Sequence, residues 1–303
     1  MSEQPGGRVA PGEAGRVSRP TAPERVGVLG GGRMGAGIAH AFLVAGSHVT
    51  VVERDDDAAE AARTRVLDSV AASVARGTTD ETADAIGVRL AVATDVDGFA
   101  GAGLVIEAVP EDLDLKLEAL TRVEAVLGTD AALATNTSSI SIDALADRLD
   151  RPARFLGLHF FNPVPASALV EVVRGTDTDG ALVEEARGWV QAIAKTPIVV
   201  HDAPGFASSR LGVALGLEAI RMLEEGVASA EDIDAAMTLG YKHPVGPLKL
   251  TDLVGLDVRL GIAEYLAGEL GDRFAPPALL RRMVEEGRLG RKTGEGFYLW
   301  DAQ

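Results

Sequence analysis

Two patterns of apolar positions divide this 303-residue chain. Up to about residue 202, short apolar runs typical of buried parallel strands alternate with longer segments whose apolar residues have helical spacing. This alternation predicts an α/β fold with helices on both faces of a doubly wound parallel sheet. Beyond the junction at 201–205 only helical spacing remains. We therefore expect an α/β domain at residues 25–202 and a smaller all-helical domain at residues 203–303.

The most informative stretch runs from Arg25 to Asp55. An apolar strand leads into a glycine-rich turn that fits GxGxxG, then into a helical segment and a second apolar strand that ends on Glu53. This strand–turn–helix–strand–acid order is the pattern of a dinucleotide-binding βαβ unit and predicts a Rossmann-type domain. The turn consists of Gly30, Gly31, Gly32, Arg33, Met34 and Gly35.

Each part of this unit suits a dinucleotide. Gly30 permits a tight turn, Gly32 lets the backbone approach a pyrophosphate, and Gly35 allows close packing of helix and strand. The helix N-terminus offers free N–H groups to the phosphates. The Glu53 carboxylate can accept hydrogen bonds from the adenine ribose and would repel a 2′-phosphate, so we expect NAD as the cofactor. The neighbouring Arg54 weakens this preference over NADP.

Two helical segments, 58–76 and 81–87, lie between the second and third predicted strands. A plain mononucleotide unit has one short crossover helix at this point. We expect this inserted helical hairpin to border the cofactor cleft and to shape a second binding site.

The composition excludes several classes of function. A formal net charge of −16 disfavours nucleic acid as a partner, and no apolar stretch is long enough to span a membrane. The absence of cysteine excludes disulfides, thiolate nucleophiles and thiolate metal sites; we expect no metal. Residues 1–24 lack the apolar centre of a signal peptide and are predicted to be a disordered tail. A cytoplasmic enzyme is therefore expected.

Three polar residues fall at predicted strand ends, where the working residues of a doubly wound sheet lie. His159 follows an apolar strand and could take a hydroxyl proton as hydride leaves the same carbon. Glu171, on the next strand, could hold the other imidazole nitrogen, and Ser138 could hydrogen-bond the substrate oxygen. The pattern alone leaves structural alternatives open: a buried histidine, a carboxylate at the rim, and a serine that caps a helix.

Several longer motifs carry a resemblance to a known family. They are GGGRMGAGIA, EAVPEDLDLK, NTSS, GLHFFNPVP followed by LVEV, PGF-x-x-x-R, YKHPVGP, DLVGLD and GRKTGEGFY. Over residues 25–300 the chain resembles the 3-hydroxyacyl-CoA dehydrogenases, and among them the short-chain bacterial 3-hydroxybutyryl-CoA dehydrogenase type. The resemblance implies NAD-dependent interconversion of (S)-3-hydroxyacyl-CoA and 3-oxoacyl-CoA, with an acyl-CoA as substrate. It also implies a homodimer formed through the helical domain.

The resemblance further implies roles for individual residues. His159 resembles the family's catalytic base, Glu171 its partner, and Ser138 the serine near the substrate hydroxyl and the nicotinamide. In the inserted helix, Ser69 and Arg76 fall near the family's contacts to CoA. The family has a lysine where Arg76 stands, and either cation can pair with a phosphate. Further positions match residues that contact NAD: Glu111, Lys116, Asn162 and Lys292.

The chain departs from the family pattern near the predicted site. The family usually has PGF-x-x-N-R, whereas Ser209 replaces the asparagine here. We expect Ser209 to orient a substrate oxygen with a shorter side chain and one donor rather than two. The residues at 166–168 are small where relatives often carry Met-Lys, which predicts room for a bulkier or polar acyl chain, such as that of a dicarboxylic acyl-CoA.

Two other functions remain compatible with the sequence. The same chemistry could act on an acyl-carrier-protein thioester, or the chain could be a weakly catalytic NAD-binding protein. Only the Ser209 substitution favours the second alternative, and the presence of Ser138, His159 and Glu171 opposes it.

Overall fold

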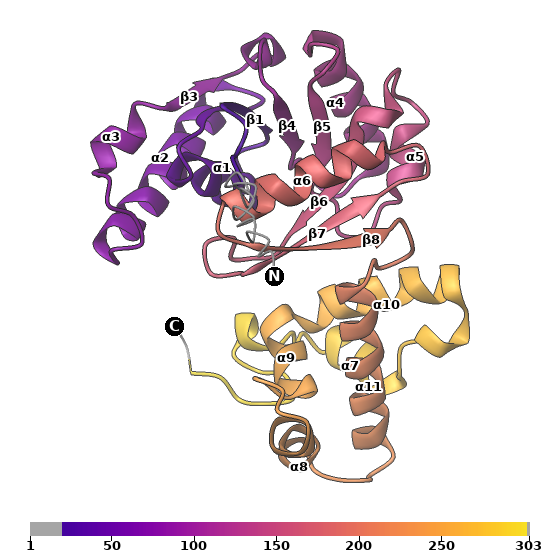
Figure 1. Ribbon diagram of the computed structural model, residues 1–303. Coiled ribbons are helices and arrows are strands. Elements are labelled where there is room, and N and C mark those ends of the chain that lie inside the picture. The colour runs from indigo at the N-terminus through magenta and orange to yellow at the C-terminus, as the bar shows by residue number, and fades with distance from the viewer. Residues whose placement is uncertain (1–19, 302–303) are drawn as a thin grey trace, which may run out of the picture.

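The computed structural model describes residues 20–301. The predicted tail at residues 1–24 therefore lies outside the described residues, except for 20–24. Strands and helices alternate through the first part of the chain, as the apolar pattern predicts, and helices predominate in the second (Figure 1). The strands are β1 (Arg25–Leu29), β2 (His48–Val52), β3 (Leu90–Ala93), β4 (Leu104–Glu107), β5 (Ala132–Thr135), β6 (Phe155–Phe160), β7 (Leu169–Arg174) and β8 (Thr196–His201).

The helices fall into two groups. Those that accompany the sheet are α1 (Arg33–Val44), α2 (Asp56–Ala75), α3 (Ala83–Gly87), α4 (Leu113–Val126), α5 (Ile142–Ala146) and α6 (Gly180–Ala192). Those of the helical domain are α7 (Ser208–Glu224), α8 (Ala230–Ala235), α9 (Pro247–Val254), α10 (Leu256–Leu270) and α11 (Ala278–Glu285). None of the helices within residues 20–301 has both the length and the apolar character needed to cross a bilayer.

The strands form one sheet in the order β3-β2-β1-β4-β5-β6-β7-β8. One face carries α1, α2 and α6, whose apolar side chains share a core with Val28 and Leu158. The other face carries α4 and α5, which pack with Phe99 and Phe155. Helices on both faces confirm the doubly wound Rossmann-type fold. The strand order reverses between β1 and β4, and ligands of such sheets bind at the carboxyl ends of the strands at this point.

The prediction of a sheet that is parallel throughout is wrong at β7 and β8, which run opposite to the other strands. β7 pairs with β6 in antiparallel register, and β8 runs parallel to β7. The connection at 161–168 is too short for the crossover that parallel neighbours require. Glu171 therefore lies in the amino-terminal half of β7 rather than at a carboxyl end. The antiparallel register pairs it directly with His159.

The helical domain has its own apolar core and a buried carboxylate that joins two of its segments. Asp252, near the end of α9, is 1% exposed. Its carboxylate accepts hydrogen bonds from the backbone N–H groups of Phe297 and Tyr298, each at 2.9 Å, and from Nε1 of Trp300 at 2.8 Å. The DLVGLD and GRKTGEGFY motifs thus join to close this domain, which lies below the sheet and is connected to it through β8 and α7 in Figure 1.

Candidate active site

A cavity of about 690 Å³ opens at the carboxyl ends of β1, β2 and β4, where the strand order reverses. This volume is in the range of small-molecule and cofactor sites. A smaller cavity of about 140 Å³ lies at the opposite ends of these strands, away from the glycine turn. The larger cavity is lined by several of the predicted cofactor residues, namely Gly30, Gly32, Arg33, Met34 and Glu53.

Different structural features explain the glycines at positions 30, 32 and 35 of the turn. Gly30 has a φ of +92°, a left-handed conformation that favours glycine. A Cβ on Gly35 would overlap the carbonyl oxygen of Gly30, so the close approach of the helix to the strand requires glycine at this position. A Cβ on Gly32 would meet no atom within 4 Å. The fold itself does not demand a glycine at 32, and the open space beside the α1 N-terminus fits a bound pyrophosphate.

The Glu53 carboxylate supports the turn and faces the cavity. Its Oε1 accepts a hydrogen bond from the Gly31 N–H at 2.7 Å. The Arg54 side chain is 83% exposed, and its Nε pairs with Asp55 at 2.9 Å. Arg54 also lines the cavity, but its Nε is paired with Asp55, so we expect the Glu53 carboxylate to meet the ribose at the end of β2. This arrangement fits NAD better than its 2′-phosphorylated form.

His159 and Glu171 face each other across β6 and β7. Nδ1 of His159 lies 2.7 Å from Oε2 of Glu171, and the two residues are 6% and 0% exposed. The imidazole also packs against the ring of Phe161, at a centroid distance of 4.5 Å. The carboxylate fixes the orientation of the ring, so Nε2 is the nitrogen left to meet a substrate. Such a pair can accept a proton at Nε2 and stabilise the resulting imidazolium.

Glu171 has a second side-chain partner that the sequence analysis missed. The hydroxyl of Ser208 lies 2.6 Å from Oε2, and the N–H groups of Ser208 and Ala207 donate to Oε1 at 2.9 and 3.1 Å. These donors stand at the start of α7, where the helix dipole also favours an anion. Burial acts to raise the pKa of Glu171, but the hydrogen bonds from His159 and Ser208 outweigh it and hold the pKa below its usual value.

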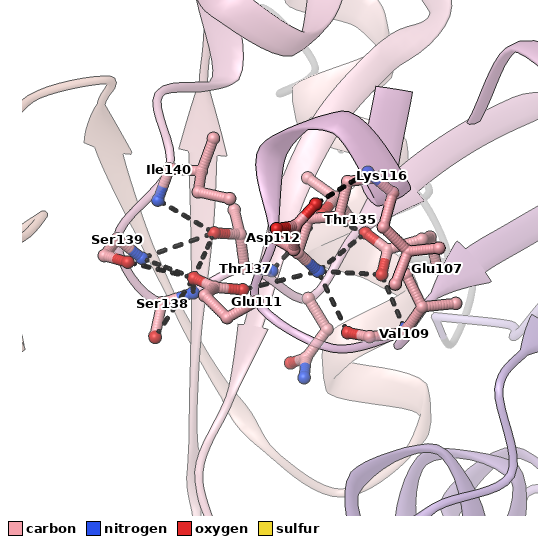
Figure 2. A network of polar contacts seen from close by, with 12 residues as sticks. Glu107, Val109, Glu111, Asp112, Lys116, Thr135, Thr137, Ser138, Ser139 and Ile140 are labelled. Carbon is pink, nitrogen blue, oxygen red and sulfur yellow. Dashed lines mark hydrogen bonds and ion pairs between the residues drawn. The ribbon is translucent and has the colours of Figure 1, made fainter. Parts of the chain in front are cut away.

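Ser138 lies in the NTSS loop after β5, and Glu111 holds this loop (Figure 2). Oε1 of Glu111 accepts from Oγ1 of Thr137 at 2.6 Å, from the Ser138 N–H at 2.9 Å and from the Ser139 hydroxyl at 3.0 Å. Burial acts to raise the pKa of Glu111, but the charge of Lys116 and these hydrogen bonds lower it. The carboxylate therefore fixes the backbone on which the predicted substrate-binding serine stands.

Lys116 belongs to the same network. Its side chain is 1% exposed, and Nζ lies 2.7 Å from Oε1 of Glu107 and 3.4 Å from Oε2 of Glu111. Thr135 donates its hydroxyl to the other oxygen of Glu107 at 2.6 Å. The ammonium group is thus enclosed by protein, and the structure does not bring it to the wall of the cofactor cavity. Figure 2 shows the chain of contacts from Glu107 through Lys116 to Glu111.

Comparison with known families decides the assignment of the chain. Residues 25–203 match the NAD binding domain of 3-hydroxyacyl-CoA dehydrogenase, and residues 205–300 match the C-terminal domain of the same family. The chain belongs to the 3-hydroxyacyl-CoA dehydrogenase family. Its cofactor is NAD, as the glycine turn and Glu53 predict.

Individual relatives agree with this family over most of their length. The 3-hydroxybutyryl-CoA dehydrogenase of Mycobacterium tuberculosis is 43% identical over 282 residues, which cover 91% of this chain and 98% of the relative. A probable 3-hydroxybutyryl-CoA dehydrogenase of Deinococcus radiodurans is 40% identical over 275 residues, or 90% and 99% of the two chains. The crystal structure of (S)-3-hydroxybutyryl-CoA dehydrogenase from Ralstonia eutropha has a TM-score of 0.88 at 39% identity and covers 93% of this chain and 100% of that one.

The remaining residues that the family resemblance singled out lie away from the cavity wall. Asn162 is exposed directly after β6. Lys292 stands in the helical domain, where its Nζ pairs with Asp257 at 2.6 Å. On α2, the hydroxyl of Ser69 donates to a carbonyl of its own helix, and Arg76 is exposed at the helix end.

Ser209 follows Ser208 on the first turn of α7 and is half-buried. The contact to Glu171 is made by Ser208 and not by the residue that replaces the family asparagine. The roles predicted for these residues stay predictions. Within residues 20–301, no group of histidine and acidic side chains is arranged to hold a metal ion.

Proposed function

We propose that this chain catalyses the reversible NAD-dependent oxidation of a short (S)-3-hydroxyacyl-CoA to the 3-oxoacyl-CoA, with His159 as the general base. The contact of 2.7 Å between Nδ1 of His159 and Oε2 of Glu171 carries the proposal. Nε2 removes the proton of the 3-hydroxyl group, and the Glu171 carboxylate stabilises the imidazolium that forms. The names of the relatives, which refer to 3-hydroxybutyryl-CoA, support a short acyl group.

Bound NAD supplies the acceptor for the hydride that leaves C3. The glycine turn and the α1 N-terminus hold its pyrophosphate, and Glu53 holds the adenine ribose. Ser138 donates to the substrate oxygen from the loop that Glu111 fixes. Glu111 and Lys116 then serve the cofactor site by positioning this loop. We also retain Asn162 and Lys292 as proposed NAD contacts and Ser209 as a group that orients a substrate oxygen.

The CoA part of the substrate is proposed to lie along the inserted helices. Arg76 provides an exposed cation at the C-terminal end of α2, and Ser69 lies two turns earlier on the same helix. A guanidinium at this point suits the phosphates of CoA. The CoA moiety would then approach from the α2 side of the sheet and direct its thioester toward His159.

We further propose a homodimer that forms through the helical domain. Several large apolar side chains of this domain are exposed, among them Leu211 at 70%, Leu239 at 72% and Tyr241 at 76%. Exposed apolar groups of this kind support an interface between copies. The cytoplasmic location expected from the sequence stays a prediction.

The test is NADH oxidation by the purified full-length chain with acetoacetyl-CoA and with acetoacetyl-acyl-carrier protein. We expect turnover with the CoA thioester, and His159→Ala should lower kcat by about 10²–10⁴. The Kd for NADH should be unchanged, because His159 is not part of the cofactor cavity. Preference for the carrier protein would change the substrate class. Binding of NADH without turnover of either thioester, or an Ala variant as active as the wild type, would refute the proposal.

A further inference from the structure

The helical domain contains a buried arginine that has no acidic partner among residues 20–301. Arg259, on α10, is 5% exposed. Its Nε is buried and has no hydrogen-bond partner within residues 20–301. Burial alone lowers the pKa of Arg259 to about 10, with no opposing contribution from a carboxylate. Buried arginines are normally paired. We therefore expect this guanidinium to bind an acceptor that residues 20–301 do not supply.

The neighbouring helix makes room for the guanidinium. Gly212 and Gly216 lie one turn apart on the same face of α7. A Cβ on Gly212 would lie 3.5 Å from Nη1 of Arg259, and a Cβ on Gly216 would lie 3.7 Å from its Nε and 3.2 Å from Oγ1 of Thr251. Side chains at these positions would fill the space around the guanidinium. The glycines therefore leave it unobstructed along α7.

The guanidinium lies along the N-terminal half of α7. Nε lies nearest Gly216 and Nη1 nearest Gly212, so the group is directed toward the N-terminal end of α7. At that end, the Ser208 hydroxyl binds the Glu171 carboxylate that holds His159. Gly212 follows Ser208 by one helical turn, about 6 Å along the axis. Figure 1 shows this end of α7 directly below β8, with α10 beside it.

A guanidinium beside Gly212, one helical turn from Ser208, suits the far end of an acyl chain held at His159. Of the guanidinium nitrogens, only Nε is both fully buried and unpartnered, which leaves Nη1 and Nη2 to meet a ligand. These two nitrogens form the fork that binds a carboxylate with two parallel hydrogen bonds. A neutral acyl end would leave the buried charge unpaired.

We propose that Arg259 binds a carboxylate at the distal end of the acyl group, so that the preferred substrates are dicarboxylic 3-hydroxyacyl-CoA thioesters. This inference rests on the proposed dehydrogenase function of the His159–Glu171 pair. The chemistry at C3 is unchanged: His159 would exchange the hydroxyl proton, and bound NAD would supply the acceptor for the hydride in oxidation or its source in reduction. Arg259 determines which acyl chain is held.

The test compares substrates that differ only in the distal group. NADH oxidation by the full-length enzyme is measured with acetoacetyl-CoA, 3-oxohexanoyl-CoA and 3-oxoadipyl-CoA, the last two having acyl chains of equal length. We expect kcat/KM to be higher for 3-oxoadipyl-CoA than for 3-oxohexanoyl-CoA by about tenfold or more, the size of a charge-assisted hydrogen bond. Arg259→Met should abolish this ratio and leave turnover of acetoacetyl-CoA, whereas Arg259→Lys should keep part of it.

Arg281→Met is the matched control, because it removes an exposed arginine of the same domain that already pairs with Glu264. The substrate ratio should not change in this variant. Equal rates of the wild type on the six-carbon substrates would overturn the role of Arg259, even if the variants fail to fold. Loss of turnover on all substrates together with dissociation of subunits in Arg259→Met would also overturn it, since the partner of Arg259 would then be a second copy. No turnover of any CoA thioester by the wild type would instead refute the dehydrogenase function itself.

Discussion

The hydroxyl of Ser208 lies 2.6 Å from Oε2 of Glu171, the same carboxylate oxygen that lies 2.7 Å from Nδ1 of His159. Oε2 therefore accepts from both the proposed base, His159, and the serine at the start of α7, while Oε1 accepts from backbone N–H groups at the start of α7. The helical domain thus contributes directly to the orientation of a carboxylate that belongs to the sheet. Ser208 is a positioning residue, because it acts on the reaction through Glu171.

Removal of this hydroxyl should impair turnover more than binding. In Ser208→Ala we expect kcat to fall by about tenfold, since a hydrogen bond to a charged group is worth about 1.5–3 kcal/mol. The KM for acetoacetyl-CoA should change little. Steady-state kinetics of NADH oxidation measure both quantities. Ser208→Thr keeps the hydroxyl and should retain most of the rate; equal losses in the Thr and Ala variants would argue against the hydrogen bond.

Ser208→Ala should also change the dependence of kcat on pH in the acidic range. Burial acts to raise the pKa of Glu171, and the hydrogen bonds from His159 and Ser208 hold it below its usual value of 4.5. A carboxyl with a depressed pKa stays ionised until the pH falls below that of an ordinary glutamic acid. Loss of one hydrogen bond raises the pKa, so Ser208→Ala should lose activity at a higher pH than the wild type. Profiles of kcat against pH that coincide would contradict this explanation.

The fold and cofactor site could be predicted because their signals are local. The glycine turn, the helix after it and Glu53 lie within Arg25 to Asp55, and the strand and helix periods extend over single elements. The pairing of Glu171 with His159 could be expected only from the family resemblance. Its structural cause, the antiparallel register of β6 and β7, depends on how the connection at 161–168 returns the chain, which the apolar pattern does not report.

Contacts between distant segments account for what the sequence did not predict. Ser208 and Glu171 are 37 positions apart, and no spacing rule distinguishes Ser208 from the adjacent Ser209. Likewise, a lysine on a helix is normally assigned to the surface, yet Lys116 is enclosed because Glu107 lies at the buried end of β4. These contacts depend on where the folded chain places each side chain relative to the sheet, which the sequence pattern does not report.

The glycines of the turn offer a matched pair of substitutions. In Gly35→Ala the new Cβ would overlap the carbonyl oxygen of Gly30, so we expect a lower Tm and reduced soluble yield. In Gly32→Ala the Cβ has no neighbour within 4 Å, and the φ of −62° is accessible to alanine, so Tm should hold. Gly32→Ala should instead raise the Kd for NADH by about tenfold, because the methyl group occupies the space of the pyrophosphate. Thermal melts and NADH fluorescence titrations separate the two effects, and tight NADH binding by Gly32→Ala would contradict the predicted phosphate position.

The charge of Glu53 should determine the choice between NADH and NADPH. Glu53→Gln keeps an oxygen that can accept from the Gly31 N–H but removes the negative charge that repels a 2′-phosphate. We expect the ratio of kcat/KM for NADH to that for NADPH to fall by about tenfold, mostly through weaker discrimination against NADPH. Arg54→Gln tests the neighbouring cation, which also lines the cavity and pairs with Asp55. If Arg54→Gln changes the ratio more than Glu53→Gln does, the arginine and not the glutamate determines the discrimination between NADH and NADPH.

The Glu111 network should make part of the stability dependent on pH. Burial acts to raise the pKa of Glu111, whereas the charge of Lys116 and the hydrogen bonds from Thr137, Ser138 and Ser139 lower it below 4.5. A group with a depressed pKa in the folded state contributes stability above its unfolded pKa, and this contribution is lost as the pH falls through the folded value.

Glu111→Gln should therefore reduce the free energy of unfolding at pH 7 by about 1–2 kcal/mol, the size expected for hydrogen bonds to a partly exposed carboxylate. The difference from the wild type should shrink as the pH falls from about 4.5 through the lowered pKa of the folded state, below which the wild-type carboxyl is also neutral. Urea unfolding at a series of pH values measures this difference. Glu118→Gln, on the outer side of α4, is a control that should show no such dependence. A Glu111→Gln deficit that stays constant down to pH 3 would mean that the shape of the side chain, rather than its charge, holds the NTSS loop.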